Sequence, residues 1–515
     1  MASTAAASES SSTRILVSKI YEYLPYLVPL LLIVHLIRRR YGSPLRKYPG
    51  PVLASFSRLH SLLSVASGKY PDRITALHAR YGPIVRIAPN ELSFSSPEAA
   101  RELLSAGKGF HKTPFYSVFP PPENPDIFTE TREDVHARKK RVANVPYSMA
   151  AMQQLTPFID ETIEVLLSKL NNSEGKVDLG DWLHFFAFDV LGEVAFSRKF
   201  GFLVQGVDID DTIKTIDDSQ WYNGIVGQVP ELNHLFRNNP LWKLVPAIKM
   251  GKSALITQMA LNEMGKRKPF EKSGGRTDME ADRKDLLQSL IEGHLKSPDK
   301  FGEGDVFAVA HGAISFAGSD STASTMQSFF WHVLRDPRVY SAVVSEVLTA
   351  SKSGKLSERV TWAEAQQLPY FQACLKEAMR TRPAVGVNIS RLIPQGGAEV
   401  NGTWLPGGTS VAVNGWVLHK DKRIFGEDAD DFKPERWLED EEKAKKMERY
   451  MFQFGGGSHL CIGRNLALLE MNKILPLLLK EYDIELIHPD RPLNANTTFF
   501  VVQSGLEVLI KRRGS

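Results

Sequence analysis

Residues 303–334 give the longest helical pattern in the chain, a run of 32 residues with apolar side chains on nearly every side. At 1.5 Å per residue such a helix would be roughly 50 Å long. A helix that is apolar all round is buried in the interior of a large domain. With 515 residues, 43% of them hydrophobic, the chain can form one large core. The pattern therefore predicts a mainly helical domain organised around this segment.

The middle of this segment, Ala317 to Thr322, interrupts the apolar pattern with a carboxylate and hydroxyl groups. Gly312 and Gly318 would each cost about 1 kcal/mol relative to alanine, which indicates a kink or the close approach of a ligand. Ser321 follows Ala317 by about one turn, so we expect its hydroxyl to bond back to the Ala317 carbonyl and open the helix. A helix cap or a packed polar cluster would explain the same residues without any chemistry.

A glycine-rich stretch near the C-terminus, from Phe454 to Arg464, presents Cys461 just before a helical pattern. Neighbouring glycines let backbone N–H groups approach the sulfur, and the start of a helix adds positive potential, so both favour a thiolate. A phosphate-binding loop is excluded because no Lys-Ser/Thr pair follows the last glycine, and a dinucleotide-binding turn because no strand-like run precedes it. The remaining alternative is that Cys461 is a small buried apolar residue.

The pattern Phe-x-x-Gly-x-His-x-Cys-x-Gly, from Phe454 to Gly463, resembles the haem-ligand loop of the cytochrome P450 family. The resemblance implies a P450 fold, mainly α with small β-sheets (α+β), in which the long central helix lies over haem b. It implies that Cys461 is the thiolate ligand of the haem iron, and that Phe454, Gly455 and Gly463 shape the loop around it. Most members have arginine two residues before the cysteine. This chain has His459 there, which we expect to contact a haem propionate.

The polar interruption in the central segment resembles the family's oxygen-activation motif, Ala/Gly-Gly-x-Asp/Glu-Thr-Thr/Ser. On this resemblance Asp320 is the acid and Ser321 the alcohol that relay protons during oxygen activation. Serine stands where threonine is usual, so the hydroxyl is kept but the methyl group that restricts its rotamer is lost. Thr322 is the alternative donor.

Three charged residues resemble the network with which the family locks the segment beneath the haem. Glu377 and Arg380 are three residues apart and share one face of a predicted helix that ends before Pro383. The resemblance implies that Arg436 joins them and that their role is structural. An exposed ion pair, which would contribute little to stability, is the alternative.

Further residues correspond to the family's contacts with haem and substrate. His136 and Lys140 are about one helical turn apart and fit the spacing of two propionate contacts, and Arg391 stands where the family places another. A solvated basic face would also explain the charged run around His136. The resemblance implies a substrate pocket lined by Phe115, Tyr116, Ala317, Val385, Val387 and Phe499.

The N-terminal residues predict a membrane anchor. Residues 1–14 are predicted to be disordered, residues 15–37 are apolar and about long enough to span a bilayer, and residues 38–51 form a basic, proline-rich hinge before the catalytic domain, residues 52–515. Arginines follow the apolar run, unlike in a secretory signal peptide. This charge order predicts a single-pass anchor in the endoplasmic reticulum, with the domain facing the cytosol. A buried core helix is the alternative.

The resemblance implies a monooxygenase that uses O2 and electrons from NADPH to oxidise a mainly apolar small molecule. Only 54 residues follow Cys461 (515 − 461), so we expect the electrons to come through a separate flavoprotein, an NADPH-cytochrome P450 reductase. A net charge of +4 gives no reason to expect nucleic acid as a partner. We expect the reductase to dock near the cysteine loop, against Lys443, Lys445, Lys446, Arg449 and Lys473.

Residues 419–429 and 469–471 are similar to membrane-bound fungal members of the pisatin demethylase-like group, which implies secondary-metabolite biosynthesis. Hydroxylation, epoxidation and demethylation share one oxidant, so the motifs do not choose among them. Two other functions stay open: a haem-thiolate isomerase or dehydratase that needs no reductase, and a non-catalytic membrane haem protein. Neither would need Asp320 and Ser321, and the NADPH dependence of turnover distinguishes them from a monooxygenase.

Overall fold

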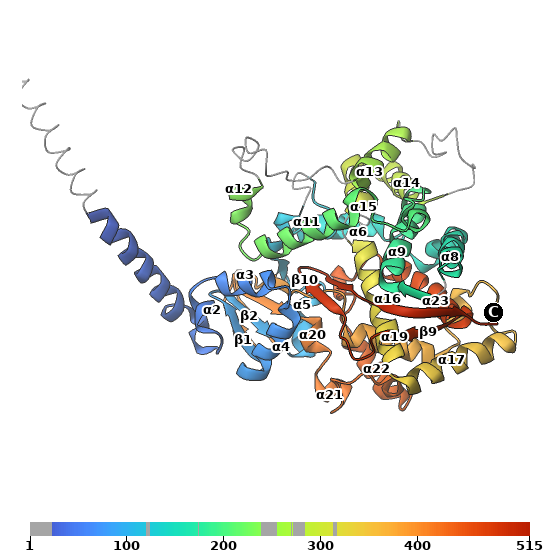
Figure 1. Cartoon of the computed structure of the whole chain (residues 1–515). Helices are drawn as coiled ribbons and strands as arrows, with labels where there is room; N and C mark the ends of the chain where they lie inside the picture. Colours follow the sequence, from blue (N-terminus) through green and yellow to red (C-terminus); the bar gives the residue numbers. More distant parts are fainter. Residues whose placement is uncertain are drawn as a thin grey trace, which may run out of the picture.

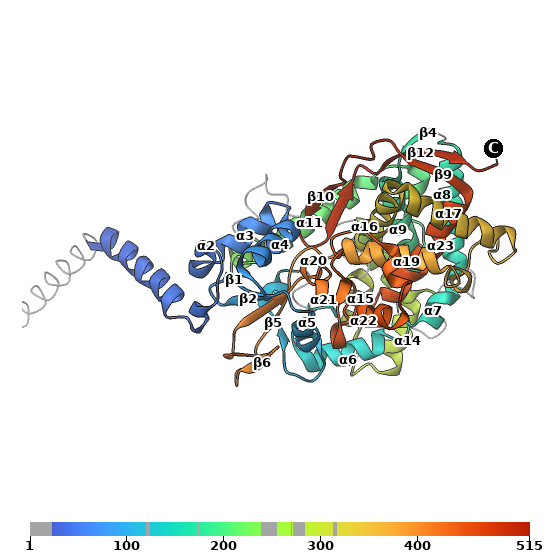
Figure 2. The same ribbon diagram turned by 90° about the horizontal axis from the view of Figure 1, so that it is seen from below.

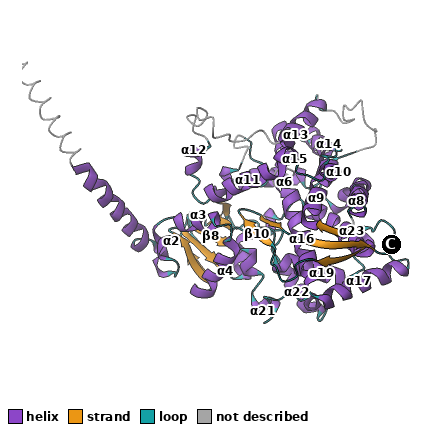
Figure 3. Cartoon of the chain, viewed as in Figure 1, coloured by secondary structure: helices purple, strands orange, loops and turns teal. Residues whose placement is uncertain are grey.

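The computed structural model of the chain describes residues 23–119, 124–173, 175–237, 255–268, 270, 284–312 and 317–514. Helices form most of the molecule, a five-stranded sheet lies beside the N-terminal helices, and a three-stranded sheet lies near the C-terminus (Figures 1 and 3). The predicted fold class, mainly α with small sheets, is confirmed.

Helices and strands are numbered in chain order, and 3-10 helices are marked η. The helices are α2 (Val52–Phe56), α3 (Leu59–Ala66), α4 (Tyr70–Tyr81), α5 (Pro97–Leu104), α6 (Glu133–Ala143), α7 (Met149–Gln154), α8 (Thr156–Asn171), α9 (Leu179–Phe196), α10 (Phe202–Gln205), α11 (Thr212–Val226), α12 (Leu232–Phe236), α13 (Leu255–Lys266), α14 (Leu286–Lys296), α15 (Glu303–Gly312), α16 (Gly318–Arg335), α17 (Pro337–Lys352), α18 (Trp362–Ala365), α19 (Pro369–Thr381), α20 (Gly415–Leu418), α21 (Lys422–Phe425), α22 (Glu441–Arg449) and α23 (Arg464–Glu481). The short helices near the site are η2 (Pro114–Val118), η6 (Pro434–Trp437) and η7 (Gly457–His459). The strands are β1 (Ile84–Ala88), β2 (Glu91–Phe94), β3 (His111–Lys112), β4 (Gly175–Asp178), β5 (Ile389–Leu392), β6 (Ala398–Val400), β7 (Thr403–Leu405), β8 (Ser410–Val413), β9 (Tyr482–Leu486), β10 (Asn494–Thr497), β11 (Val501–Ser504) and β12 (Glu507–Arg512).

The predicted central helix, residues 303–334, is described as two segments, α15 and α16, and residues 313–316 between them lie outside the described part of the chain. The Ser321 hydroxyl donates to the Ala317 carbonyl at 2.6 Å, so the expected back-bond is confirmed. Most of α16 is buried, and it packs against α9, α19 and α23 in the middle of the largest apolar cluster (Figure 1). The segment that organises the fold is thus also the one that carries the polar motif.

Short strands position loops around the interior. The five-stranded sheet has the order β1-β2-β8-β5-β3, and β1 and β2 form an antiparallel hairpin. The alternating apolar residues and the turn residues of 84–96 are typical of such a hairpin. Asn401 and Gly402 join β6 to β7 with positive φ angles of 48° and 73°, a turn that twists as the flanking strands do. The β10–β11 hairpin places Phe499 and Phe500 in its turn.

A helix that includes residues 23–41 projects from the body of the molecule (Figures 1 and 2). Many of its apolar side chains are exposed. Buried Arg86 on β1 donates to the carbonyls of Arg39 at 3.0 Å and Arg40 at 3.3 Å, so it caps this helix. The helix therefore continues through the start of the predicted hinge, residues 38–51. Within the described ranges, no helix combines the length and the apolar character that crossing a membrane requires. Residues 1–22, which include the predicted disordered start and part of the predicted anchor, lie outside these ranges.

Candidate active site

Cys461 lies at the end of a tight loop between α22 and α23. Its backbone N–H donates to the Phe454 carbonyl at 2.8 Å, which closes the loop. Gly455 and Gly457 have positive φ angles of 74° and 57°, a region that favours glycine. A Cβ atom on Gly457 would lie 1.6 Å from the carbonyl oxygen of Leu104 on α5, so no side chain fits there. The glycines thus allow the loop to press against α5 and present Cys461 to the interior.

Two opposing effects act on the Cys461 thiol. The side chain is exposed to the adjoining cavity and hollow, but the surrounding protein atoms desolvate the sulfur and raise its pKa, while the N–H groups of Gly463 and Arg464 and the positive charge of Lys140 lower it. The backbone N–H groups lower the thiol pKa as expected, but desolvation has the larger effect, so the protein alone favours the neutral thiol. A metal cation against the sulfur reverses this balance, because coordination deprotonates a thiol outright.

Cys461 faces a deep and largely apolar cavity between the cysteine loop and the central helix. The lining comes from α6, α15, α16, α23, β5 and the β10–β11 turn, with aromatic rings at one end. It includes the predicted residues Tyr116, His136, Lys140, Ala317, Ser321, Thr322, Val385, Arg391, Phe454, Gly455, His459, Cys461, Gly463 and Phe499. The structure therefore brings most of the predicted site together around one space.

Two predicted pocket residues do not line the cavity. Phe115 packs behind the lining, with its ring centroid 5.4 Å from that of Tyr116 and 6.2 Å from that of Phe499. Its ring fills the space beside Gly227, where a Cβ atom would be only 2.6 Å away. Val387 is buried in the same aromatic cluster. Both residues support the wall of the pocket rather than form its surface.

The polar end of the cavity is formed by α6 and the cysteine loop. The rings of His136 and His459 stack with centroids 4.2 Å apart, and Lys140 donates to the carbonyls of Ser458 and Leu460 at 2.7 and 2.5 Å. Burial, reinforced by the nearby charge of Lys112, lowers the pKa of His136 to about 2, so this imidazole is neutral. The stacked pair sits where it can meet the edge of a planar ligand.

Two further polar residues at this end were missed by the sequence analysis. Glu133 lies 2.9 Å from His459 Nε2, and Lys112 donates to three carbonyls of residues 127–130. Burial, then the charge of Arg391, lowers the pKa of Lys112 to about 7. Glu133 precedes His136 by one helical turn, and this spacing could have identified it as a member of the site. Nothing in the local sequence indicates a role for Lys112.

Several buried polar atoms at this end have no hydrogen-bond partner among the described residues. They are Nδ1 of His136, Nδ1 of His459 and Nε of Arg391. Buried polar groups are nearly always hydrogen-bonded, so Arg391 Nε and His136 Nδ1, together with the nearby cations, fit an anionic ligand group. His459 Nε2 already donates to Glu133, so its Nδ1 could donate only from a protonated ring. The carboxylates of a haem would fit these donors, and the Cys461 sulfur would hold its iron.

The acid and the alcohols of the central helix point in different directions. Ser321 and Thr322 line the cavity, but Asp320 does not. The Asp320 carboxylate instead meets His184 Nε2 on α9 at 2.8 Å and accepts a short hydrogen bond from Gln220 on α11. The sequence analysis missed His184 and Gln220 because they are 136 and 100 residues away along the chain.

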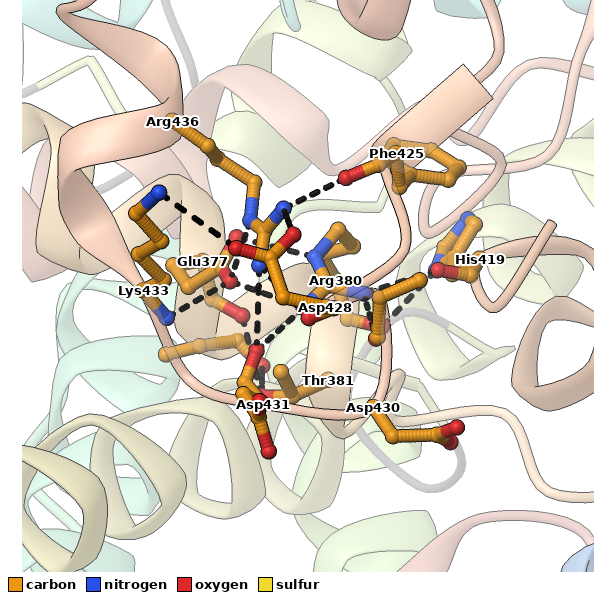
Figure 4. Close-up of polar contacts among 12 residues, drawn as sticks. Glu377, Arg380, Thr381, His419, Phe425, Asp428, Asp430, Asp431, Lys433 and Arg436 are labelled. Carbon is orange, nitrogen blue, oxygen red and sulfur yellow. Dashed lines mark hydrogen bonds and ion pairs between the residues drawn. The ribbon is translucent and has the colours of Figure 1, made fainter. Parts of the chain in front are cut away.

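Glu377, Arg380 and Arg436 form a buried network, as the resemblance implies (Figure 4). Glu377 accepts from Arg380 at 2.7 and 2.8 Å and from Arg436 at 2.9 Å, and it also accepts from the Trp437 indole at 2.8 Å. Arg380 donates to the carbonyls of residues 419, 429 and 431. The network thus joins α19 to the segment that leads to the cysteine loop.

His419, whose role the sequence analysis did not identify, connects this network to the loop. Its Nδ1 lies 3.1 Å from the Arg380 carbonyl, and its Nε2 accepts from the Phe452 N–H at 2.9 Å. Burial lowers the pKa of His419 to about 3, so the ring is neutral and can both donate and accept. One imidazole therefore ties Arg380 to the residues just before Cys461.

A surface hollow next to the cavity also reaches Cys461 and is lined by Lys140, Arg141, Leu460 and Arg464 among others. Lys473 was expected at this surface, and that expectation is wrong. It is 1% exposed and bonds to Asp160 at 2.8 Å and to the Val360 carbonyl at 3.0 Å, because α23 runs through the interior. The cations of α22 are exposed.

Comparisons with known proteins agree with this site. The family model described as Cytochrome P450 matches residues 49–510. The chain is 34% identical to cytochrome P450 monooxygenase cicH of Emericella nidulans, over 90% of this chain and 93% of that protein. It is 32% identical to cytochrome P450 monooxygenase gsfF of Penicillium aethiopicum, over 92% of this chain and 94% of that protein. It is 34% identical to cytochrome P450 monooxygenase mpaDE of Penicillium roqueforti, over 91% of this chain and 55% of that protein.

Proposed function

The chain belongs to the cytochrome P450 family, and we propose that it oxidises a mainly apolar secondary metabolite with O2 and with electrons that an NADPH-dependent flavoprotein delivers. It is a haem-thiolate monooxygenase. The observation that carries the proposal is the position of Cys461 across an apolar cavity from the hydroxyls of Ser321 and Thr322. An isomerase or a non-catalytic haem protein gives no reason for hydroxyls at that place.

Different residues of the chain bind the haem, shape the space around its iron ligand and contact the substrate. When bound, haem supplies the oxygen chemistry, for which a thiolate ligand donates electron density to the iron. His136, His459 and Arg391 would hold its carboxylates, and Phe454 and the loop glycines shape the space around the sulfur. The aromatic wall that includes Tyr116 and Phe499 orients an apolar substrate and excludes water.

Product formation by membranes that carry this chain and a reductase tests the proposal. With NADPH and an extract of fungal secondary metabolites, we expect mass spectrometry to find a product that has gained one oxygen atom and requires NADPH. Recovery of this activity with the membrane fraction tests attachment to the membrane. A product that forms equally without NADPH would replace the proposal with the isomerase function.

Ser321→Ala is expected to yield about tenfold less product per NADPH and correspondingly more hydrogen peroxide, because a hydroxyl that passes protons is removed. The measurement is the ratio of product to NADPH consumed. Thr325→Val is the matched control, since Thr325 also lines the cavity and also bonds back along the helix, to the Ser321 carbonyl at 2.8 Å. If both variants lost product equally, the back-bond rather than the proton relay would explain the loss.

We further propose that the flavoprotein docks over the hollow beside Cys461, where Lys140, Arg141 and Arg464 present positive charge. Arg141→Glu is expected to slow haem reduction about tenfold at low salt, and the difference should shrink as salt screens it. Stopped-flow reduction measures this. Lys511→Glu on β12 makes the same charge change away from the hollow, so the haem of this variant should be reduced at the normal rate. A stronger effect of Lys443→Glu would move the docking face to α22.

Attachment to the endoplasmic reticulum membrane, with the catalytic domain in the cytosol, is also part of the proposal. It is supported by the exposed apolar side chains of residues 23–37, which continue onto α2 and α3 as Val52, Leu53, Leu59 and Leu63. Positive charge at residues 38–40 follows directly. Apolar side chains beside such charge suit the boundary between lipid and its anionic headgroups.

A further inference from the structure

Asp320 does not line the cavity and is held by side chains of two other helices, α9 and α11. One carboxylate oxygen meets Nε2 of His184 on α9 at 2.8 Å, and the other accepts from the side-chain amide of Gln220 on α11. Asp320 and Gln220 are buried, whereas the His184 side chain keeps 14% of its surface exposed. Among the described side chains that bond to Asp320, His184 is the one that is partly exposed.

A second carboxylate lies close to this pair. Asp217 on α11 is near enough for its charge and those of His184 and Asp320 to act on one another. Its Oδ1 is buried and has no hydrogen-bond partner among the described residues, and the same holds for Oε1 of Gln220. Two unpaired acceptors beside an imidazole form an environment that favours an added proton.

We propose that His184 resupplies Asp320 with protons from solvent during turnover, and that Asp217 stabilises the charged imidazole. In each transfer the Nε2–H bond of His184 breaks, an O–H bond forms on Asp320 Oδ1, and the imidazole then takes a proton from solvent. The inference rests on the proposed function, because each monooxygenation consumes O2, two electrons and two protons and yields oxidised product and water. His184 and Asp217 act through Asp320 and do not touch substrate.

The electrostatics of the cluster are consistent with this role. Burial works against protonation of His184, yet the hydrogen bond to Asp320, then the charges of Asp320, Asp217 and Asp181, raise its pKa above the ordinary 6.5. Burial, then the charge of Asp320, raises the pKa of Asp217 to about 7, while His184 lowers it and Asp218 and Asp208 raise it further. The hydrogen bond and the neighbouring charges therefore favour the protonated form of His184.

A purely structural pair would also join α9 to α16, and His184→Gln separates the two roles. Glutamine can still donate a hydrogen bond to Asp320, but it cannot take up and release a proton. We expect His184→Gln to form about tenfold less product per NADPH near pH 6. Coupling in the wild-type enzyme should fall as pH rises through the His184 pKa and approach that of the variant. Equal coupling of the two proteins at every pH would overturn the proposal.

Thermal unfolding of the haem-loaded proteins gives a second readout that needs no turnover. A histidine with a raised folded-state pKa stabilises the fold fully below its unfolded pKa of about 6.5, and this stabilisation disappears as pH rises through the folded pKa. The Tm difference between wild type and His184→Gln should therefore be largest near pH 6 and shrink by pH 9. A difference that did not change with pH would show that His184 carries no charge and would also overturn the proposal.

Asp217→Asn keeps His184 and removes its countercharge. We expect the pH midpoints of both coupling and the Tm difference to move to lower pH in this variant, and unmoved midpoints would remove Asp217 from the proposal. The proposed function fails separately, if the wild-type protein forms no NADPH-dependent product. In that case the Tm series still tests the pairing of His184 with Asp320.

Discussion

Cys461→His is expected to abolish the thiolate-type carbon monoxide spectrum and to lower product formation at least about 100-fold, or about 2.7 kcal/mol of barrier. A neutral imidazole does not donate electron density as a thiolate does. The loop leaves little freedom for a substitute, because Gly457 is pressed against Leu104 and the Cys461 N–H is already bonded to Phe454. The reduced protein with carbon monoxide measures the spectrum directly.

The chain contains a matched control for this experiment. Cys374 is its other cysteine and is fully buried on α19, in the apolar core. Cys374→Ala should keep the thiolate-type spectrum and should lose only a small amount of stability to the cavity it creates. An unchanged spectrum in Cys461→His, or its loss in Cys374→Ala, would contradict the assignment of Cys461 as the ligand.

Glu377→Gln is expected to destabilise the protein by about 3–5 kcal/mol, because it leaves two buried guanidinium groups without their shared countercharge. Glu377 is fully buried and accepts hydrogen bonds from Arg380, Arg436, Trp437 and the Lys433 backbone (Figure 4). A large chain of this kind can unfold irreversibly, so the rate of haem loss on heating is the appropriate measurement. We expect that loss to be much faster in the variant.

An exposed ion pair beside the same network provides the comparison. Lys420 and Asp430 are 3.1 Å apart, but their side chains are 38% and 67% exposed. Asp430→Asn should change stability by less than about 1 kcal/mol. If it accelerated haem loss as much as Glu377→Gln, burial would not be the reason for the importance of the network.

Features set by neighbouring residues could be predicted from the sequence. The hydrogen bond from Ser321 to Ala317, the β1–β2 hairpin and the turn of the Cys461 loop each depend on side chains and glycines a few positions apart. The pairing of Glu377 with Arg380 is of the same kind. The family motifs then supplied the longer-range relation between Cys461 and the central helix.

Features set by tertiary packing could not be predicted in this way. The direction of Asp320 depends on His184, which is 136 residues away. Whether Phe115 or Tyr116 faces the cavity depends on the space beside Gly227. Lys473 was expected at the surface, but α23 carries it into the interior, where Asp160 and the Val360 carbonyl bind its charge. The helix through Arg39 and Arg40 likewise depends on Arg86.

Cys461 borders both the cavity and the basic hollow, together with His136, Lys140, Tyr147, Leu460 and Ile462, so the two spaces meet at the cysteine loop and α6. Most of the remaining lining differs: the aromatic wall belongs to the cavity, and Arg141 and Arg464 belong to the hollow. Mutations can therefore accumulate in one set without touching the other. Under natural selection such a chain can acquire a new substrate while it retains its inherited redox partner, and the cysteine loop is the part that neither change can alter.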